Sequence, residues 1–194
     1  ERDQANRHGL YRADQERDAC GVGFVAHIKG QQSHAIVEQG LQILKNLTHR
    51  GAVGADPLAG DGAGILIQMP DAFLRREFAK QKIGLPKAGD YAIAQLFLPR
   101  DAATRATCEK IIGDIVKEEG QSLLGWRDVP TRNARLGQGV QAVEPVMRQA
   151  LIARGQATPD QNAFERKLFV IRKVAEHRIR ALAMKDREMF YVPS

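Results

Sequence analysis

The residue with the clearest capacity for chemistry is Cys20, a thiol that opens the stretch Cys-Gly-Val-Gly-Phe-Val-Ala (20–26). Gly21 and Gly23 carry no side chain, so a ligand can approach the backbone beside the thiol closely. The β-branched and aromatic residues of 22–28 predict a buried strand that begins next to Cys20. A cysteine at the edge of such a strand is also an ordinary small core residue, and its surroundings must decide between the two interpretations.

Residues 1–19 form a charged leader in which Leu10 and Tyr11 are the large apolar residues. The leader has no apolar stretch of the kind that marks a secretory signal. Its composition predicts a removable propeptide whose cleavage leaves Cys20 as the new N-terminus. A free α-amine has a pKa near ~7.7–8.0, so it can act as the general base for the thiol of its own residue.

Several motifs follow the thiol in a defined order along the chain. They are Cys-Gly-Val-Gly-Phe-Val-Ala (20–26), Leu-Thr-His-Arg-Gly-Ala (47–52), Gly-Asp-Gly-Ala-Gly-Ile (60–65), Leu-Gly-Trp-Arg-Asp-Val-Pro (124–130) and Phe-Tyr-Val-Pro-Ser (190–194). In this order the chain resembles the N-terminal glutamine amidotransferase domain of the glutamate synthase large subunit. That domain is a class II amidotransferase of the N-terminal-nucleophile hydrolase superfamily. The resemblance implies an α+β fold, an αββα sandwich of which this chain holds a part.

The resemblance also implies a reaction, the hydrolysis of L-glutamine to glutamate and ammonia through a thioester at Cys20. In the complete enzyme the ammonia serves to make glutamate from 2-oxoglutarate. Arg50 and Gly51 match the family's active-site His-Arg-Gly element, where a guanidinium contacts substrate or holds the geometry of the site. Position alone leaves Arg50 open as a cation near the negative end of a helix dipole.

The glycine-rich segment 60–64 predicts a tight turn close to Cys20. It lacks the Gly-Lys-Ser/Thr of a phosphate-binding loop, so a nucleotide site is not expected there. Asp61 and Gly62 are candidates for shaping the site, with Asp61 orienting backbone amides. The alternative is that the Asp61 carboxylate caps its own turn.

By resemblance, no cofactor binds in this part of the enzyme, whereas FMN and an iron–sulfur cluster belong to the complete enzyme. The expected partners are L-glutamine, the remaining domains of the large subunit and a small electron-donating subunit. The family's oxyanion hole and most of its glutamine clamp come from sequence beyond the point matched by Ser194. The chain alone is therefore expected to be inactive. The alternative function is a non-catalytic regulatory or docking module that keeps its leader uncleaved.

Composition limits the partners and the compartment. The net charge of +6 arises from 29 cations interleaved with 23 anions, and zinc-finger spacings and RNA-binding motifs are missing, so nucleic acid is not expected. No apolar run approaches the ~18 residues of a membrane span, so no membrane partner is expected either. The second of two cysteines, Cys108, lies on a helical apolar stripe. A disulfide framework is therefore not expected, and a reducing cytoplasm fits.

The elements expected to position the thiol lie in the first half of the chain. An apolar stripe predicts a helix over 34–48 with Ser33 as its N-cap. Residues 64–69 predict a second strand, which we expect to pair with 22–28 in one sheet with the helix packed on it. Asp71 is expected to cap a short helix that runs through Phe73, Leu74 and Phe78.

From residue 89 onward the pattern changes to alternating strands and helices. The predicted strands cover 91–98, 122–129, 146–153 and 189–192, and the predicted helices cover 101–119 and 163–183. Residues 131–142 are interpreted as a loop, and 146–153 also fits a short helix. The order βαββαβ is typical of a ferredoxin-like unit. The predicted organisation is a leader (1–19), a first part of the amidotransferase core (20–88) and a ferredoxin-like insertion that leads back to the core (89–194).

Overall fold

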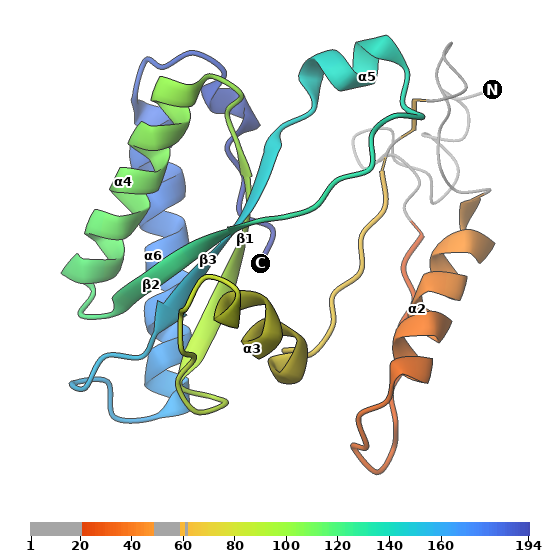
Figure 1. The fold of residues 1–194 in the computed structure, drawn as a ribbon, viewed down its shortest axis with the longest axis horizontal. Helices are drawn as coiled ribbons and strands as arrows, with labels where there is room; N and C mark the ends of the chain where they lie inside the picture. Colours follow the sequence, from red (N-terminus) through yellow and green to blue (C-terminus); the bar gives the residue numbers. More distant parts are fainter. Residues whose placement is uncertain (1–20, 49–58, 61) are drawn as a thin grey trace, which may run out of the picture. The chain divides into compact units, whose positions relative to one another are not determined.

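The computed structural model describes residues 21–48, 59–60 and 62–194. The chain divides into two compact units, Glu1–Gln68 and Met69–Ser194, and Figure 1 shows the elements of each. The predicted boundary between residues 88 and 89 stays a prediction. Among the described helices, none is both long and apolar enough to cross a membrane.

The described part of Glu1–Gln68 is built around helix α2, His34–Asn46. This confirms the helix predicted from the apolar stripe. Ser33 occupies the N-cap position with an extended backbone, but its side chain makes no capping hydrogen bond. At the other end, the Thr48 hydroxyl donates to the carbonyl of Lys45, with Oγ1 and O 2.7 Å apart.

The strands predicted at 22–28 and 64–69 are not strands in the structure, and the prediction that they pair is wrong. Neither run takes part in a ladder, and the first ends in a turn at residues 28–29, where the N–H of Gly30 donates to the carbonyl of His27 at 2.8 Å. Their apolar side chains pack on α2 or face outward instead, and Val22 and Phe24 are each 91% exposed. An apolar β-branched run indicates extended backbone, but a strand also needs a hydrogen-bonded neighbour.

Met69–Ser194 contains a three-stranded sheet of β1 (Tyr91–Leu98), β2 (Ser122–Asp128) and β3 (Val146–Ala153). The strand order is β1-β3-β2, and β3 runs antiparallel to both neighbours. This confirms the preference for a strand at 146–153. The strand predicted at 189–192 is reduced to a single bridge between Phe97 and Tyr191, because the 3₁₀ turn Arg187–Met189 occupies the start of that segment.

Two long helices, α4 (Ala102–Glu118) and α6 (Gln161–Ala181), connect and follow the strands. The Asp101 carboxylate caps α4 by accepting from the backbone N–H of Thr104 at 2.8 Å. Asp160 caps α6 in the same way through the N–H of Ala163 at 2.7 Å. The predicted loop 131–142 is partly wrong, because helix α5 spans Gln138–Val143.

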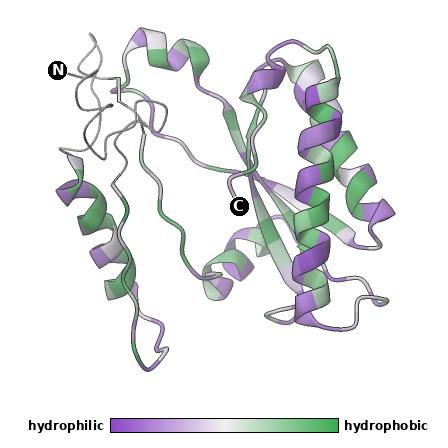
Figure 2. Cartoon of the chain, turned by 180° about the vertical axis from the view of Figure 1, so that it is seen from behind, coloured by the Kyte–Doolittle hydropathy of each residue, from purple (hydrophilic) through white to green (hydrophobic). Residues whose placement is uncertain are grey.

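The strands alternate between two apolar layers, as period-2 side-chain geometry requires. On one face, Ala92, Ala94, Leu96, Leu98, Ala150 and Ile152 pack against Cys108, Ile112, Ile115 and Val116 of α4 and Phe164, Ile171, Ala175 and Ile179 of α6. On the other face, Tyr91, Ile93 and Leu151 pack against Leu74 and Phe78 of helix α3, Asp71–Ala79. Figure 2 shows hydrophobic and hydrophilic stripes along the two long helices. The sheet is thus covered by α4 and α6 on one side and by α3 on the other.

A polar triad holds α3 to β1. The Tyr91 hydroxyl donates to Asp71 Oδ1 at 2.7 Å, and Arg75 Nε donates to Asp71 Oδ2 at 2.8 Å. Arg75 also donates to the carbonyls of Leu85 and Pro86. Hydrogen bonds from Arg75 and Tyr91 lower the pKa of Asp71. Burial, followed by the hydrogen bond to Asp71, raises the pKa of Tyr91 to about 12.

We predict that Tyr91→Phe lowers the free energy of unfolding by about 1 kcal/mol at pH 7, since it removes one part-buried hydrogen bond without changing the ring. A tyrosine with a raised native pKa stabilises the fold fully below the unfolded pKa of ~10 and loses that contribution as pH rises towards the native value. The difference between wild type and variant in urea unfolding should therefore shrink between about pH 10 and 12. Tyr191→Phe serves as the control, and a difference that is constant over this range would contradict the prediction.

Candidate functional site

Of the five candidate site residues, Cys20, Arg50, Gly51 and Asp61 lie outside the described residues. Their placement and their mutual distances stay predictions. Gly62 is described, and its φ of +85° lies in the left-handed region that favours glycine. This backbone conformation is compatible with the tight turn predicted for the segment.

The two glycines that follow Cys20 lie directly against helix α2. A Cβ built on Gly21 would stand 2.9 Å from Leu47 Cδ2, and one built on Gly23 would stand 2.7 Å from Ile43 Cγ2. Both distances are shorter than real Cβ contacts allow. The absence of side chains at these two positions thus brings the chain next to the candidate nucleophile into contact with the helix.

The segment after Cys20 presents two different faces, as extended backbone must. Gly21 and Gly23 face α2, whereas the alternate residues Val22, Phe24 and Ile28 are exposed by 91%, 91% and 102%. An apolar row of this kind on a short segment is a surface suited to being covered by another layer of protein.

The second predicted run meets the same helix at a third glycine. A Cβ on Gly40 would lie 2.9 Å from Ile65 Cδ1. Helix α2 therefore contacts the residues after Cys20 and the residues after the glycine-rich segment. Sequence reasoning missed this role of Gly40, although a glycine inside a helix is unfavourable by about 1 kcal/mol and so signals close packing.

A network of polar side chains spans the three strands of the sheet in Met69–Ser194, and the sequence analysis did not predict it. Arg127 of β2 donates to Gln149 Oε1 at 2.9 Å and to Glu77 Oε2 of α3 at 3.2 Å, and Gln149 donates to Gln95 of β1 at 3.0 Å. The Arg127 guanidinium also lies 5.3 Å from the ring centre of Phe73. With its charge paired to Glu77 at 3.2 Å, Arg127 joins α3 to the sheet.

The chemistry of the described residues is correspondingly limited. No group of three or more His, Cys, Asp or Glu side chains within them could hold a metal ion. The Cys108 thiol is 0% exposed, and burial raises its pKa to about 11. A thiol in that state is a poor nucleophile near neutral pH. Within the described residues, the contact between the segment after Cys20 and α2 is the feature nearest in sequence to the predicted nucleophile.

Comparisons with known proteins assign the sequence to a protein family. Residues 20–194 match the family described as glutamine amidotransferases class-II. Over 169 residues the chain is 46% identical to the glutamate synthase (NADPH) large chain of Bacillus subtilis strain 168. This match covers 87% of this chain and 11% of that protein.

More distant relatives carry similar names. The chain is 41% identical over 175 residues to the glutamate synthase (NADH) of Schizosaccharomyces pombe, a match to 88% of this chain and 8% of that protein. It is 32% identical over 180 residues to ferredoxin-dependent glutamate synthase 2 of Synechocystis, a match to 93% of this chain and 11% of that protein. The chain thus spans about a tenth of the length of these relatives.

We predict that Gly23→Ala lowers the free energy of unfolding by about 1–3 kcal/mol, because the new methyl group overlaps Ile43 Cγ2. The double variant Gly23→Ala, Ile43→Leu should recover part of this loss, since leucine lacks the branch at Cβ. Gly64→Ala is the matched control, because nothing lies within 4 Å of its Cβ, and it should leave stability unchanged or raise it by up to ~1 kcal/mol. Equal losses in Gly23→Ala and Gly64→Ala urea titrations would contradict the packing described.

Proposed function

Since this chain belongs to the class-II glutamine amidotransferases, we propose that it is the glutaminase part of a glutamate synthase and releases ammonia from L-glutamine. The matched region begins at residue 20, the candidate nucleophile itself, and this coincidence carries the proposal. Relatives named as glutamate synthases from a bacterium, a yeast and a cyanobacterium support it further.

The proposed reaction uses Cys20 after residues 1–19 have been removed. The free α-amine of Cys20 takes the thiol proton, and the sulfur attacks the amide carbon of the glutamine side chain. The protonated amine then gives its proton to the departing nitrogen, so that ammonia leaves and a γ-glutamyl thioester forms. Water, activated by the same amine, cleaves the thioester to glutamate and restores the thiol. Arg50, Gly51, Asp61 and Gly62 shape the site around the substrate.

The core fold that we propose is a partial αββα sandwich. Two faces of the segment after Cys20 support it. The glycine face packs on α2, and the opposite face, with Val22, Phe24 and Ile28, is apolar and exposed. In such a sandwich, the chain between the helical layer and the opposing sheet is apolar towards that sheet and closely packed towards the helices.

For residues 89–194 we propose the ferredoxin-like insertion. In its support, β1 and β2 flank β3 and are connected by α4, which is a split β-α-β arrangement. The bridge between Phe97 and Tyr191 adds the fourth position on the outer edge of β1. That gives the spatial order four-one-three-two that the unit requires.

FMN and the iron–sulfur cluster belong, in this proposal, to other domains of the complete enzyme. An iron–sulfur cluster takes about three or four thiolates, whereas the chain has two cysteines, one of them fully buried. The residues of this chain therefore do not fit that cluster. L-Glutamine, the other large-subunit domains and a small electron-donating subunit are the proposed partners, and the cytoplasm is the proposed compartment.

We predict that, in the intact synthase, Cys20→Ala reduces ammonia release from L-glutamine to background, because it removes the attacking sulfur. The matched control Cys108→Ala should retain turnover. In the wild type, kcat/KM should rise with pH and level off above about pH 8, as the α-amine loses its proton. Glutaminase activity in a form whose leader is still attached to Cys20 would rule out the amine as base and favour a different mechanism. Loss of the leader without any turnover would favour a non-catalytic module.

We predict that Arg50→Lys in the same enzyme lowers kcat/KM by about 10- to 100-fold, because an ammonium group cannot reproduce the planar pair of donors of a guanidinium. Arg132→Lys, a change of the same kind at an exposed position, is the matched control. Steady-state kinetics with glutamine measure both. An Arg50→Lys enzyme with unchanged kinetics and reduced thermal stability would assign Arg50 to the end of its helix instead.

A further inference from the structure

Ile43 of helix α2 and Leu47 at its C-cap pack against the chain that follows Cys20. The two residues are four apart, so they lie on the same face of the helix. Among the described residues, Ile43 supplies the three atoms nearest to a Cβ built on Gly23, and Leu47 supplies the three nearest to one built on Gly21. The described chain from Gly21 onward therefore begins beside the C-terminal end of α2 and runs back along this face.

Leu47 lies against Gly21, the residue bonded to Cys20. A Cβ built on Gly21 would stand 2.9, 3.1 and 3.2 Å from Cδ2, Cδ1 and Cβ of Leu47, so both branches of the leucine contact this backbone. Leu47 is itself held to the helix, because its N–H donates to the carbonyl of Ile43 at 3.0 Å. A planar peptide bond leaves two soft dihedral angles per residue. Few degrees of freedom therefore separate the packed backbone at Gly21 from the Cys20 side chain.

Leu47 also lies where the chain leaves helix α2 towards Arg50. Its φ of −88° and ψ of 4° depart from helical values, and the Thr48 hydroxyl closes the last turn by donating to the carbonyl of Lys45. Arg50 follows three residues after Leu47 in the sequence. One half-buried residue thus contacts the residue after the predicted nucleophile and ends the helix that leads to the predicted guanidinium.

We propose that Leu47 is a positioning residue for the hydrolysis of glutamine. It acts through Gly21, because its branched side chain fixes the backbone that carries the Cys20 thiol. An attacking atom must stand about 3–3.5 Å from the carbon that it attacks, and a displacement of ~1 Å lowers the rate by up to about 100-fold. This inference rests on the proposed function, since it requires Cys20 to be the nucleophile.

Packing alone is the alternative role for Leu47, and it has a different kinetic consequence. Removal of a leucine that only packs reduces the free energy of unfolding and, with it, the number of folded sites. Removal of a positioning leucine also slows the reaction at each folded site. The two roles are separated by counting sites with a chloroketone analogue of L-glutamine, whose chloride leaves as the Cys20 sulfur forms a thioether. Mass spectrometry of the Cys20 peptide then gives the labelled fraction at completion.

In the intact synthase, we expect Leu47→Ala to lower kcat per labelled site by about 10- to 100-fold, with the KM for glutamine unchanged within about twofold. kcat and kcat/KM then fall together, as they do when an interaction acts in the transition state. Leu47→Met keeps the side-chain volume and should restore most of the rate. Leu47→Val removes both Cδ atoms at a smaller cost in packing, so it shows the same kind of loss where Leu47→Ala does not fold.

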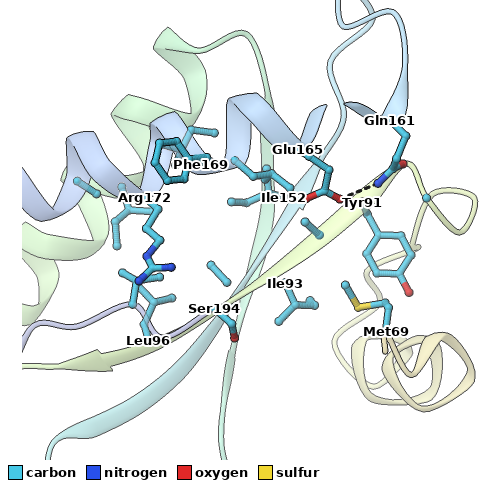
Figure 3. A pocket seen from close by; sticks show the side chains of 18 residues that line it. Met69, Tyr91, Ile93, Leu96, Ile152, Gln161, Glu165, Phe169, Arg172 and Ser194 are labelled. Atoms are coloured by element: carbon cyan, nitrogen blue, oxygen red, sulfur yellow. Dashed lines mark hydrogen bonds between the residues drawn. The ribbon is translucent and has the colours of Figure 1, made fainter. Parts of the chain in front are cut away.

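Two other half-buried leucines serve as matched controls. Leu44 lies on the same helix but supplies none of the atoms nearest to Gly21 or Gly23. Leu168 belongs to the other unit, where it lines a cavity of about 450 Å³ between β1 and α6, and Figure 3 shows this cavity from close by. Leu44→Ala and Leu168→Ala should reduce stability and the labelled fraction but leave kcat per labelled site unchanged.

An unchanged kcat per labelled site in Leu47→Ala and Leu47→Val would overturn the proposal. Equal losses in Leu47→Ala and the two controls would overturn it as well, since any lost leucine would then have the same effect. Failure of the proposed function is recognised before Leu47 is changed. In that case the wild-type enzyme releases no ammonia from glutamine, or Cys20→Ala still releases it, and this inference falls with the function.

Discussion

The two ladders of strand β3 are the constraint on which the rest of Met69–Ser194 depends. Since β3 is hydrogen-bonded to β1 on one side and to β2 on the other, each of its residues must point into one layer or the other. Ile152 points towards the long helices and Leu151 towards α3. A shift of this register by one residue would turn the side chains that face the long helices towards α3, and those that face α3 towards the long helices. The packing of both apolar layers therefore depends on the register of β3. The part-buried ion pair between Arg127 of β2 and Glu77 of α3 links one of these layers to the sheet.

Glu1–Gln68 obeys a different constraint, the close approach of backbone to a helix. Glycines supply the contact surface, two on the segment after Cys20 and one on α2 itself. Such packing leaves little freedom for substitution, because the space on each side is filled by branched side chains such as Ile43. The predicted nucleophile, Cys20, directly precedes this contact in the sequence. A nucleophile needs this kind of support, since catalytic geometry tolerates only small displacements.

Sequence patterns revealed those features that depend on local physics. The apolar stripes predicted the long helices within two residues of their ends. The strands at 22–28 and 64–69 were wrong because hydrophobicity reports burial and extension, while pairing depends on a distant partner. The short helix α5 was missed because its glycines and polar residues carry no apolar stripe. For the site, an ordered set of motifs indicated the family and the nucleophile, but no pattern in one sequence yields the distances between Cys20, Arg50 and Asp61.

The burial of Cys108 has a consequence for how the protein opens. With a pKa of about 11 and no exposed surface, the fraction of thiolate at neutral pH is on the order of 10⁻⁴, and bulky electrophiles cannot reach the sulfur in the native state. Its alkylation therefore has to wait until α4 separates from the sheet. The rate at which a maleimide alkylates the Cys108 thiol therefore reports how often the larger apolar core opens. This thiol makes the opening measurable without introducing a label by mutation.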